Sequence, residues 1–286
     1  MADNIFSGLD SFGLGGLGDM DLYGEKKEEK KAPVKKPEPV KKVVEEDSEK
    51  NYLLDRTITC PCCDNTFKYR AVKSSVARLV GSDNDLRPRH NGIDVTKYDA
   101  IVCPMCGYAA LSRYFPNLLK LQREAIQEKI SCNFKTRPGA PETYTYDEAI
   151  EMYKLTLVNA VVKNAKASEK AYICLKTSWL YRGKAEELGE GHPDYEATKA
   201  NEFEFTKNAY EGFVAAVASE SFPMCGMDEM TVNYLMANLA VMTEHYDVAS
   251  KLISTILTSI SASSRVKDKT RELKEEVIRI LRGNGK

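Results

Sequence analysis

The chain has 286 residues, 43% of them hydrophobic and 29% charged, which is typical of a folded protein with one large or two smaller domains. Its 41 basic and 42 acidic residues leave a net charge of −1, which argues against a dedicated binder of nucleic acid or anionic membranes. The sequence shows no signal-peptide pattern and no apolar run of membrane-spanning length. We therefore expect a cytoplasmic protein without membrane contact, whose eight cysteines are reduced.

Residues 1–50 are expected to form a disordered tail. The stretch 25–50 consists almost entirely of Lys, Glu, Pro and Val, a composition too polar to bury a core. The stretch 5–23 mixes glycine with spaced apolar side chains, which form either a short docking peptide on a tether or part of a tail without a role: Ile5, Phe6, Leu9, Phe12 and Leu17. Residues 13–18 match G-x-G-x-x-G by chance, because no strand precedes them and no helix follows.

Two Cys-x-x-Cys pairs, at residues 60–63 and 103–106, are separated by 39 residues. Each pair can present two sulfurs to one ion, and two pairs complete the tetrahedral shell that zinc prefers. We therefore predict one structural zinc ion, held by Cys60, Cys63, Cys103 and Cys106. The alternatives are a redox-active pair and plain buried thiols.

Two further side chains near the pairs are predicted not to be ligands. Cys62 lies inside the first pair, but symmetry with the second pair selects Cys60 and Cys63 as the ligands. A tetrahedral shell has no place for a fifth sulfur. His90 is the one imidazole of the region and is an alternative ligand that a four-cysteine shell does not need. Because such a shell is closed, no catalytic water is expected at the ion.

The pairs are expected to lie in a zinc-ribbon-like β module over residues 51–115. Gly107 follows the second pair and Asp64-Asn65 follows the first, and these residue types tolerate the left-handed turn of a knuckle. Aromatic and basic side chains alternate over residues 67–70, and residues 98–102 lead directly into the second pair, as expected for framing strands.

The module has a modest basic excess, with eight Lys and Arg against five Asp and Glu between Cys60 and Phe115. A ribbon that grips a phosphate backbone is expected to carry a denser basic face. Nucleic-acid binding is therefore the second choice, through Lys68, Arg70, Lys73, Arg78, Arg87 and Arg89.

Residues 116–286 carry apolar side chains at helical spacing and are predicted to form a helical domain. Thr145 and Glu148 form a capping box that begins the first of its helices. The following helices are expected at about 168–189, 194–219, 228–243 and 246–260, with a last helix ending at Gly283.

Two of these helices begin with the same pattern, Tyr146-Asp-Glu-Ala149 and Tyr246-Asp-Val-Ala249. A small residue three positions after Tyr, with Ala237 in the preceding helix of the second pair, is typical of tetratricopeptide repeats. The pattern predicts a degenerate tetratricopeptide-like array, and ordinary bundle packing is the alternative. Four aromatic residues are candidates to line its peptide groove: Tyr172, Tyr181, Tyr195 and Tyr234.

Catalytic motifs are missing from the sequence, which contains no H-E-x-x-H, no phosphate-binding G-x-x-x-x-G-K and no G-x-S-x-G. We therefore expect a protein that is not an enzyme. Cys132, Cys174 and Cys225 are single cysteines without metal-binding spacing, and Cys174 is expected in the core.

Three stretches resemble an uncharacterised bacterial family, domain of unknown function 2225. They are the first cysteine pair with Phe67, the segment from Asp85 to Ala109 that includes Asp-Leu-Arg-Pro-Arg-His and the second pair, and Trp179-Leu-Tyr-Arg182 ahead of Tyr246. The resemblance covers about residues 52–282. It implies a zinc-ribbon-like module joined to tetratricopeptide-like helices, and it implies no activity.

Two functions follow as expectations. The first is a protein-interaction scaffold, in which zinc locks the N-terminal module and stacked helices bind a peptide of an unidentified partner. The second is a nucleic-acid-binding ribbon with a helical effector or oligomerisation region.

Overall fold

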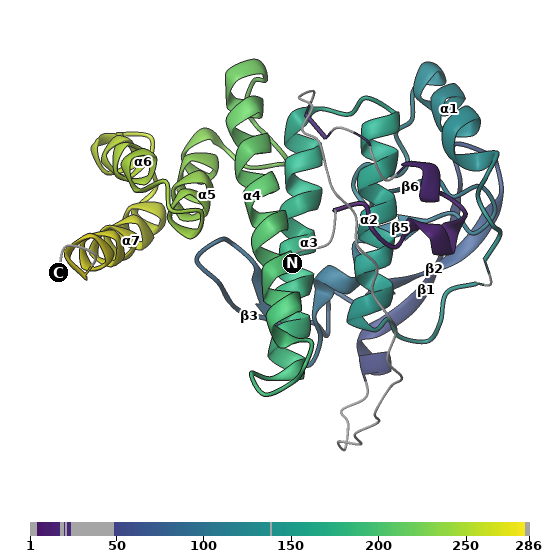
Figure 1. Ribbon diagram of the computed structural model, residues 1–286, viewed down its shortest axis with the longest axis horizontal. Helices are drawn as coiled ribbons and strands as arrows, with labels where there is room; N and C mark the ends of the chain where they lie inside the picture. The colour runs from purple at the N-terminus through teal and green to yellow at the C-terminus, as the bar shows by residue number, and fades with distance from the viewer. Residues whose placement is uncertain (1–4, 18–19, 21, 24–48, 138, 284–286) are drawn as a thin grey trace.

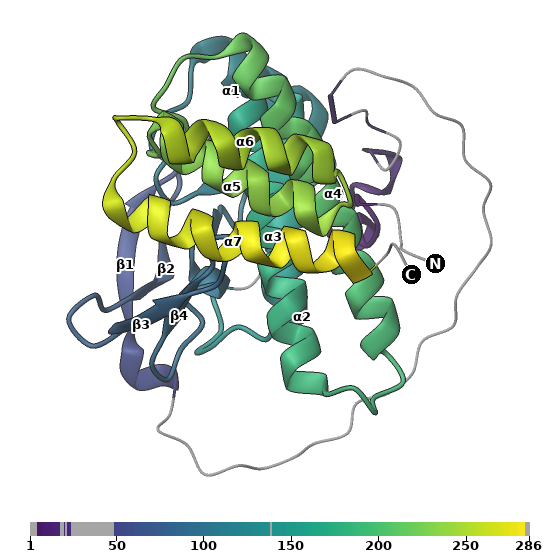
Figure 2. The same cartoon turned by 90° about the vertical axis from the view of Figure 1, so that its left-hand side faces the viewer.

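The computed structural model describes residues 5–17, 20, 22, 23, 49–137 and 139–283. Three two-stranded antiparallel hairpins are followed by a succession of helices, so this part of the chain is mainly α-helical, as predicted (Figure 1). The helices lie side by side, from α2 next to the strands, through α3 and α4, to α5, α6 and α7 at the opposite edge. Figure 2 shows these last three as one layer in front of the others.

Each cysteine pair lies in the turn of a hairpin. β1 (Leu53–Thr59) pairs with β2 (Thr66–Val72) around the first pair, and β5 (Ala100–Val102) pairs with β6 (Ala109–Leu111) around the second. The ladders close immediately beside the cysteines, at Thr59 opposite Thr66 and at Val102 opposite Ala109. Between them, β3 (Leu79–Ser82) and β4 (Pro88–His90) form a third hairpin.

The helices begin and end close to the predicted positions. Their bounds are α1 Lys120–Ile126, followed by a π-helical turn at Gln127–Ser131, then α2 Tyr146–Val162, α3 Ala167–Leu188, α4 Tyr195–Ser219, α5 Glu229–Met242, α6 Tyr246–Thr258 and α7 Ser264–Gly283. The capping box is present, because Thr145 Oγ1 accepts from Glu148 N at 3.2 Å and Glu148 Oε2 accepts from Thr145 N at 2.8 Å. None of the described helices is both long and apolar enough to cross a membrane.

One hydrophobic core runs from the strands into the helices. Phe115 lies at the predicted boundary between the two domains and is fully buried, with its ring 4.8 Å from Tyr108 and 6.1 Å from Phe67. Helix α2 packs against β5 and β6 as well as against α3. Packing is therefore continuous across the predicted boundary at residues 115–116, and the module and the helices share buried surface.

The small residues of the repeated pattern lie at close helix contacts. Ala149, Ala237 and Ala249 are fully buried, and α5 joins α6 through the short turn 243–245. This packing is compatible with a tetratricopeptide-like array, which stays a prediction. The prediction that Tyr181 and Tyr234 line a peptide groove is wrong, because both side chains are buried in the core.

The N-terminal segment, which we define as residues 5–23, differs from the expected disordered tail in its described positions. Phe6, Leu9, Phe12 and Leu14 are each at most 2% exposed, and residues 9–12 form a short 3-10 helix. The spaced apolar side chains find an apolar surface on the helical part of the chain, so that the docking alternative describes them better. Most of the stretch 25–50 lies outside the described residues.

Candidate metal centre and charge network

The structure brings together the four predicted cysteines, Cys60, Cys63, Cys103 and Cys106, with all their sulfurs within 4.8 Å of one another. Two sulfur pairs join the two knuckles, at 3.6 Å between Cys60 and Cys106 and 3.7 Å between Cys63 and Cys103. Four sulfurs placed tetrahedrally at about 2.3 Å from zinc are about 3.8 Å apart. The donor set and its spacing therefore fit one four-coordinate ion.

The two knuckles have the same backbone geometry. Asp64 has φ of 60° and Gly107 has φ of 72°, so each pair is followed by the left-handed residue that the sequence suggested. In each knuckle this residue donates its N–H to the carbonyl of the first cysteine, at 2.9 Å to Cys60 and 3.1 Å to Cys103. Gly107 is also required for space, because a Cβ there would lie 2.4 Å from the Phe134 ring.

The four sulfurs lie close together and are largely shielded from water. Cys60 and Cys103 are fully buried and Cys106 is 6% exposed. Hydrogen bonds from Cys106 and Cys60 lower the pKa of Cys103, whereas the hydrogen bonds of Cys106 with Cys103 and Cys60 raise the pKa of Cys106. Sulfurs this close cannot all ionise by themselves, and a bound divalent ion deprotonates the thiols that coordinate it.

Cys62 is not one of the four residues of the cluster. Its side chain is nevertheless fully buried, and a hydrogen bond with Cys106 lowers its pKa. Its backbone carbonyl accepts from Gln127 Nε2 at 2.9 Å, which ties the first knuckle to the turn that follows α1.

We expect Cys62→Ser to keep the full metal content of the chain, because four other sulfurs already complete a tetrahedral shell. The free energy of unfolding should fall by about 1–3 kcal/mol, since the substitution places a hydroxyl in a buried site. Elemental analysis and urea denaturation measure the two quantities. A loss of metal as large as that of Cys63→Ser would show that Cys62 is a ligand.

Side chains of the helices reach into the module. Asn159 on α2 donates to the carbonyl of Gly107 at 3.1 Å, and the Tyr153 hydroxyl donates to the carbonyl of Thr96 at 2.8 Å. Both contacts are buried. The second knuckle is therefore held from α2, and the order of the metal site is linked to the packing of the central helix.

The other cysteines and the histidine candidate lie elsewhere. His90 is in β4 and is not part of the four-residue cluster. Cys174 is in the core, as predicted, Cys132 is exposed, and Cys225 is partly buried with its thiol 3.2 Å from the carbonyl of Ser168.

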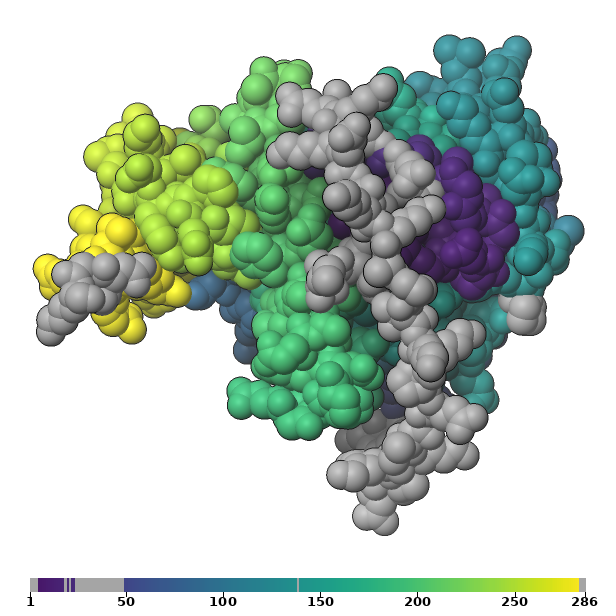
Figure 3. Space-filling view, viewed as in Figure 1, coloured from purple at the N-terminus to yellow at the C-terminus, as the bar shows by residue number. Residues whose placement is uncertain are grey.

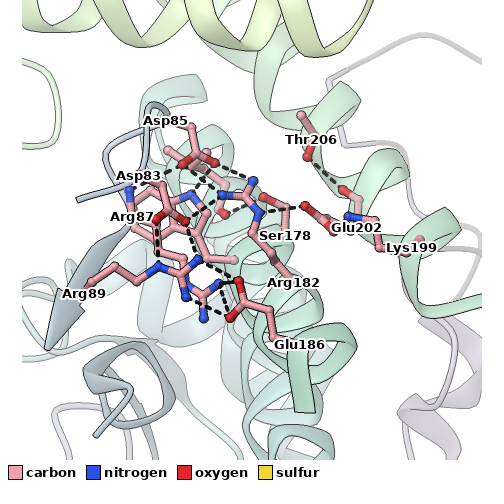
Figure 4. A network of polar contacts seen from close by, with 12 residues as sticks. Asp83, Asp85, Arg87, Arg89, Ser178, Arg182, Glu186, Lys199, Glu202 and Thr206 are labelled. Carbon is pink, nitrogen blue, oxygen red and sulfur yellow. Dashed lines mark hydrogen bonds and ion pairs between the residues drawn. The ribbon is translucent and has the colours of Figure 1, made fainter. Parts of the chain in front are cut away.

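A second cluster, which the sequence analysis missed, is a network of ion pairs between the β3–β4 hairpin and α3 (Figure 4). Arg89 pairs with Asp83, at 2.7 and 2.8 Å, and with Glu186, at 2.6 and 2.7 Å. Arg87 is 2% exposed and pairs with Asp94 at 2.8 Å and with Glu186 at 3.3 Å. These contacts fix the hairpin on the C-terminal half of α3.

The centre of this network is Asp85, which is 2% exposed. Its carboxylate accepts from Trp179 Nε1 at 2.9 Å and from Arg182 at 2.7 and 3.1 Å. Arg182 also donates to Asp83 at 3.1 Å and to Glu202 on α4 at 2.8 Å. Two of the stretches that carry the family resemblance, around Asp85 and around Trp179, therefore meet in space.

The arginines of the network stabilise the ionised form of its carboxylates. Burial raises the pKa of Asp83, but the hydrogen bonds of Arg89 and Arg182 outweigh it, so that the pKa lies below its ordinary value. A hydrogen bond from Arg89 likewise lowers the pKa of Glu186. A pocket of about 270 Å³ opens beside the network, and its charged lining is largely composed of the same paired side chains. We assign the network a structural role.

The network also pairs two of the basic residues proposed for nucleic-acid binding with carboxylates. Arg87 and Arg89 are neutralised by carboxylates, and Arg70 pairs with Asp55 at 2.6 Å. Lys68 and Arg78 remain as exposed positions. The ribbon therefore presents a sparser basic face than its composition suggested.

Comparison with known proteins gives one match. Residues 53–277 match the model of a family described as uncharacterized protein conserved in bacteria (DUF2225), which confirms the resemblance seen in the sequence. No curated protein and no solved structure matches the chain. The matched region contains both cysteine pairs and the whole charge network, and it begins after the N-terminal segment.

Proposed function

The chain belongs to the bacterial family DUF2225, and from its own residues we propose that it is a zinc-dependent protein-interaction scaffold in the cytoplasm. In this proposal one zinc ion binds Cys60, Cys63, Cys103 and Cys106 and has a structural role. The helices that follow supply the surface that holds a partner protein.

The observation that carries the proposal is the four-sulfur cluster. The match of its spacing to tetrahedral zinc supports a shell with four protein ligands, which leaves no open position for a substrate or a catalytic water. The ion then contributes order, by closing the loop between the two hairpins and presenting them to α2. This is the basis for proposing binding instead of chemistry.

The helical part supports the same role. Helices α2 to α7 stack in succession with fully buried alanines at the contacts, and arrays of this kind offer extended surfaces for peptides. Nucleic-acid binding ranks below it, because three of the six basic side chains proposed for it are paired with carboxylates.

The test is capture with the tagged full-length chain in bacterial cells, with cross-linking before lysis and mass spectrometry of what is retained. We expect one specific protein that survives high-salt washes and is lost with Cys103→Ser, while Cys132→Ser retains it. Retention of nucleic acid that disappears as salt rises, with no specific protein, would favour the alternative function.

A further inference from the structure

The N-terminal segment lies across α2, α3 and α4 as a peptide lies in a binding site. In Figure 3 the described residues of its first part form a purple patch that borders the teal part of the chain. The first part rests on α2 and the loop 134–137, and Leu22 and Tyr23 reach α3 and α4. The segment thus crosses three helices that belong to the matched family region.

Four apolar anchors hold the first part. Phe6, Leu9, Phe12 and Leu14 are buried, at relative positions 0, 3, 6 and 8. The Phe12 ring stacks on Phe134 at a centroid distance of 6.2 Å, and the Arg137 guanidinium lies 3.8 Å from its centroid. Side-chain anchors of this kind provide the specificity of a peptide ligand.

Two lysines hold the main chain of the segment. Lys154 on α2 donates to the carbonyl of Ser7 at 2.9 Å, and Lys170 on α3 donates to the carbonyl of Leu22 at 2.6 Å. Charge-assisted bonds to carbonyls hold a peptide by its backbone, whatever its side chains. These bonds add affinity, and the apolar anchors supply the selectivity.

The far end has a site shaped for Tyr23. Its hydroxyl donates to the carbonyl of Asn208 at 2.9 Å, and burial raises its pKa well above the ordinary value, so that it stays a donor. Gly212 on α4 leaves the necessary room, because a Cβ there would lie 2.0 Å from this hydroxyl. The surface is therefore complementary to the segment at both ends.

The segment is also separable from the domain. The family match begins at residue 53, and among the described residues one backbone hydrogen bond, from Lys135 N to Phe12 O, joins residues 5–17 to the rest of the chain. The 25 residues between positions 23 and 49 are rich in Lys, Glu, Pro and Val. A covalent connection of this length keeps the segment near its site at an effective concentration of about 1 mM.

We propose that the surface of α2, α3 and α4 under the N-terminal segment is a peptide-docking groove, and that residues 5–23 of the same chain are its releasable resident ligand. The inference rests on the scaffold function proposed above and names its surface. A partner that uses the groove carries a peptide with apolar anchors at the same spacing and must displace the resident segment.

The first test measures binding of a fluorescent synthetic peptide of residues 5–23 to two full-length chains. One is the wild type, and the other is Leu9→Asp/Phe12→Asp, which releases the resident segment. If the free peptide binds at about 10 µM, a tether at about 1 mM weakens its binding to the wild type by about 100-fold relative to the variant. Equal binding to both chains, or no binding to a variant that keeps its helical circular dichroism, overturns the inference.

Matched peptides separate docking from unspecific adhesion. A Leu9→Asp peptide should lose at least tenfold in affinity, whereas Gly16→Asp adds the same charge at an exposed position with no atom near its Cβ and should bind as well as the original. Lys154→Met in the groove should weaken binding of the original peptide. Binding that is weakened neither by Leu9→Asp in the peptide nor by Lys154→Met in the chain contradicts a defined groove.

A second measurement covers the case in which the double variant does not fold. A site for a sequence-specific protease, inserted between residues 36 and 37 of the wild-type chain, converts the segment into a free ligand. Excess labelled peptide should then exchange with it while the helical signal is constant, and a segment that leaves only when the chain unfolds overturns the inference. Dimers that form with rising concentration of the uncut chain would overturn the same-chain assignment in favour of a second copy.

The scaffold function and the groove can fail separately. A peptide that does not bind, together with a partner still captured by the full chain, removes the groove and leaves the scaffold. A peptide that binds as expected, without any captured partner, leaves the groove as a contact within the chain and contradicts the scaffold.

Discussion

Replacing Cys103 with serine is expected to remove the metal from the chain and to lower its free energy of unfolding by more than about 3 kcal/mol. Structural zinc contributes about 10–16 kcal/mol in small zinc-binding peptides, because the site does not exist without the folded chain. Three thiolates and a hydroxyl hold zinc far more weakly than four thiolates do. Elemental analysis and urea denaturation followed by circular dichroism give the two values.

The effect should spread beyond the hairpins, because Asn159 on α2 binds the second knuckle. Hydrogen exchange should rise over β1, β2, β5 and β6, rise less over α2, and stay unchanged over α5 to α7. Cys132→Ser is the matched control, since it removes an exposed thiol outside the cluster and should change neither metal content nor stability. Normal metal content in Cys103→Ser contradicts the proposed shell.

Asp85→Ala should be the most harmful single change in the charge network, with a loss of about 3–5 kcal/mol in the free energy of unfolding. The substitution leaves the Trp179 indole N–H without its acceptor, and it removes the most buried of the three carboxylates that Arg182 contacts. Removing one partner of a buried ion pair is strongly destabilising, because the charge that stays behind is less well compensated. Urea denaturation monitored by circular dichroism measures the loss without depending on the fluorescence of the single tryptophan.

The matched control is Asp268→Ala, which breaks an exposed pair with Arg271 on α7 and should cost less than about 1 kcal/mol. The double variant Asp85→Ala/Arg182→Ala should lose less than the sum of the two single changes, because it removes both partners of the contact. A loss for Asp85→Ala no larger than that for Asp268→Ala contradicts the role of the network.

The cluster and most helices could be predicted because their signals are local. Two cysteines three positions apart define a knuckle by themselves, and the residues after each pair, Asp64 and Gly107, carry the positive φ that ends it. Helix starts were equally local. Thr145 and Asp228 each accept a hydrogen bond from a backbone N–H three residues later.

The charge network could not be predicted because its partners are distant in the chain. Arg89 and Glu186 are 97 residues apart, and Asp85 and Arg182 are also 97 residues apart. Without these pairings Arg87 and Arg89 counted as free basic residues and favoured a nucleic-acid surface. The indication in the sequence was indirect, since the same residues carried the family resemblance.

Two other features could not be predicted, one because the strand is very short and the other because its packing partner is distant in the chain. Strand β6 has three residues, Ala109–Leu111, and all are buried, so no alternation of polar and apolar side chains marks it. The N-terminal segment has anchors without helical or strand periodicity, and its composition resembles a tail. Its order depends on a surface formed by helices more than 120 residues further along the chain.

The central claim, a closed four-sulfur metal site that orders the module without doing chemistry, is tested most directly by X-ray absorption at the zinc edge. The protein should be the full-length chain, purified without added metal. We predict one zinc ion per chain with four sulfur neighbours at about 2.3 Å and no oxygen or nitrogen ligand. A shell with a water or imidazole ligand, or a folded chain that contains no metal, would contradict the account.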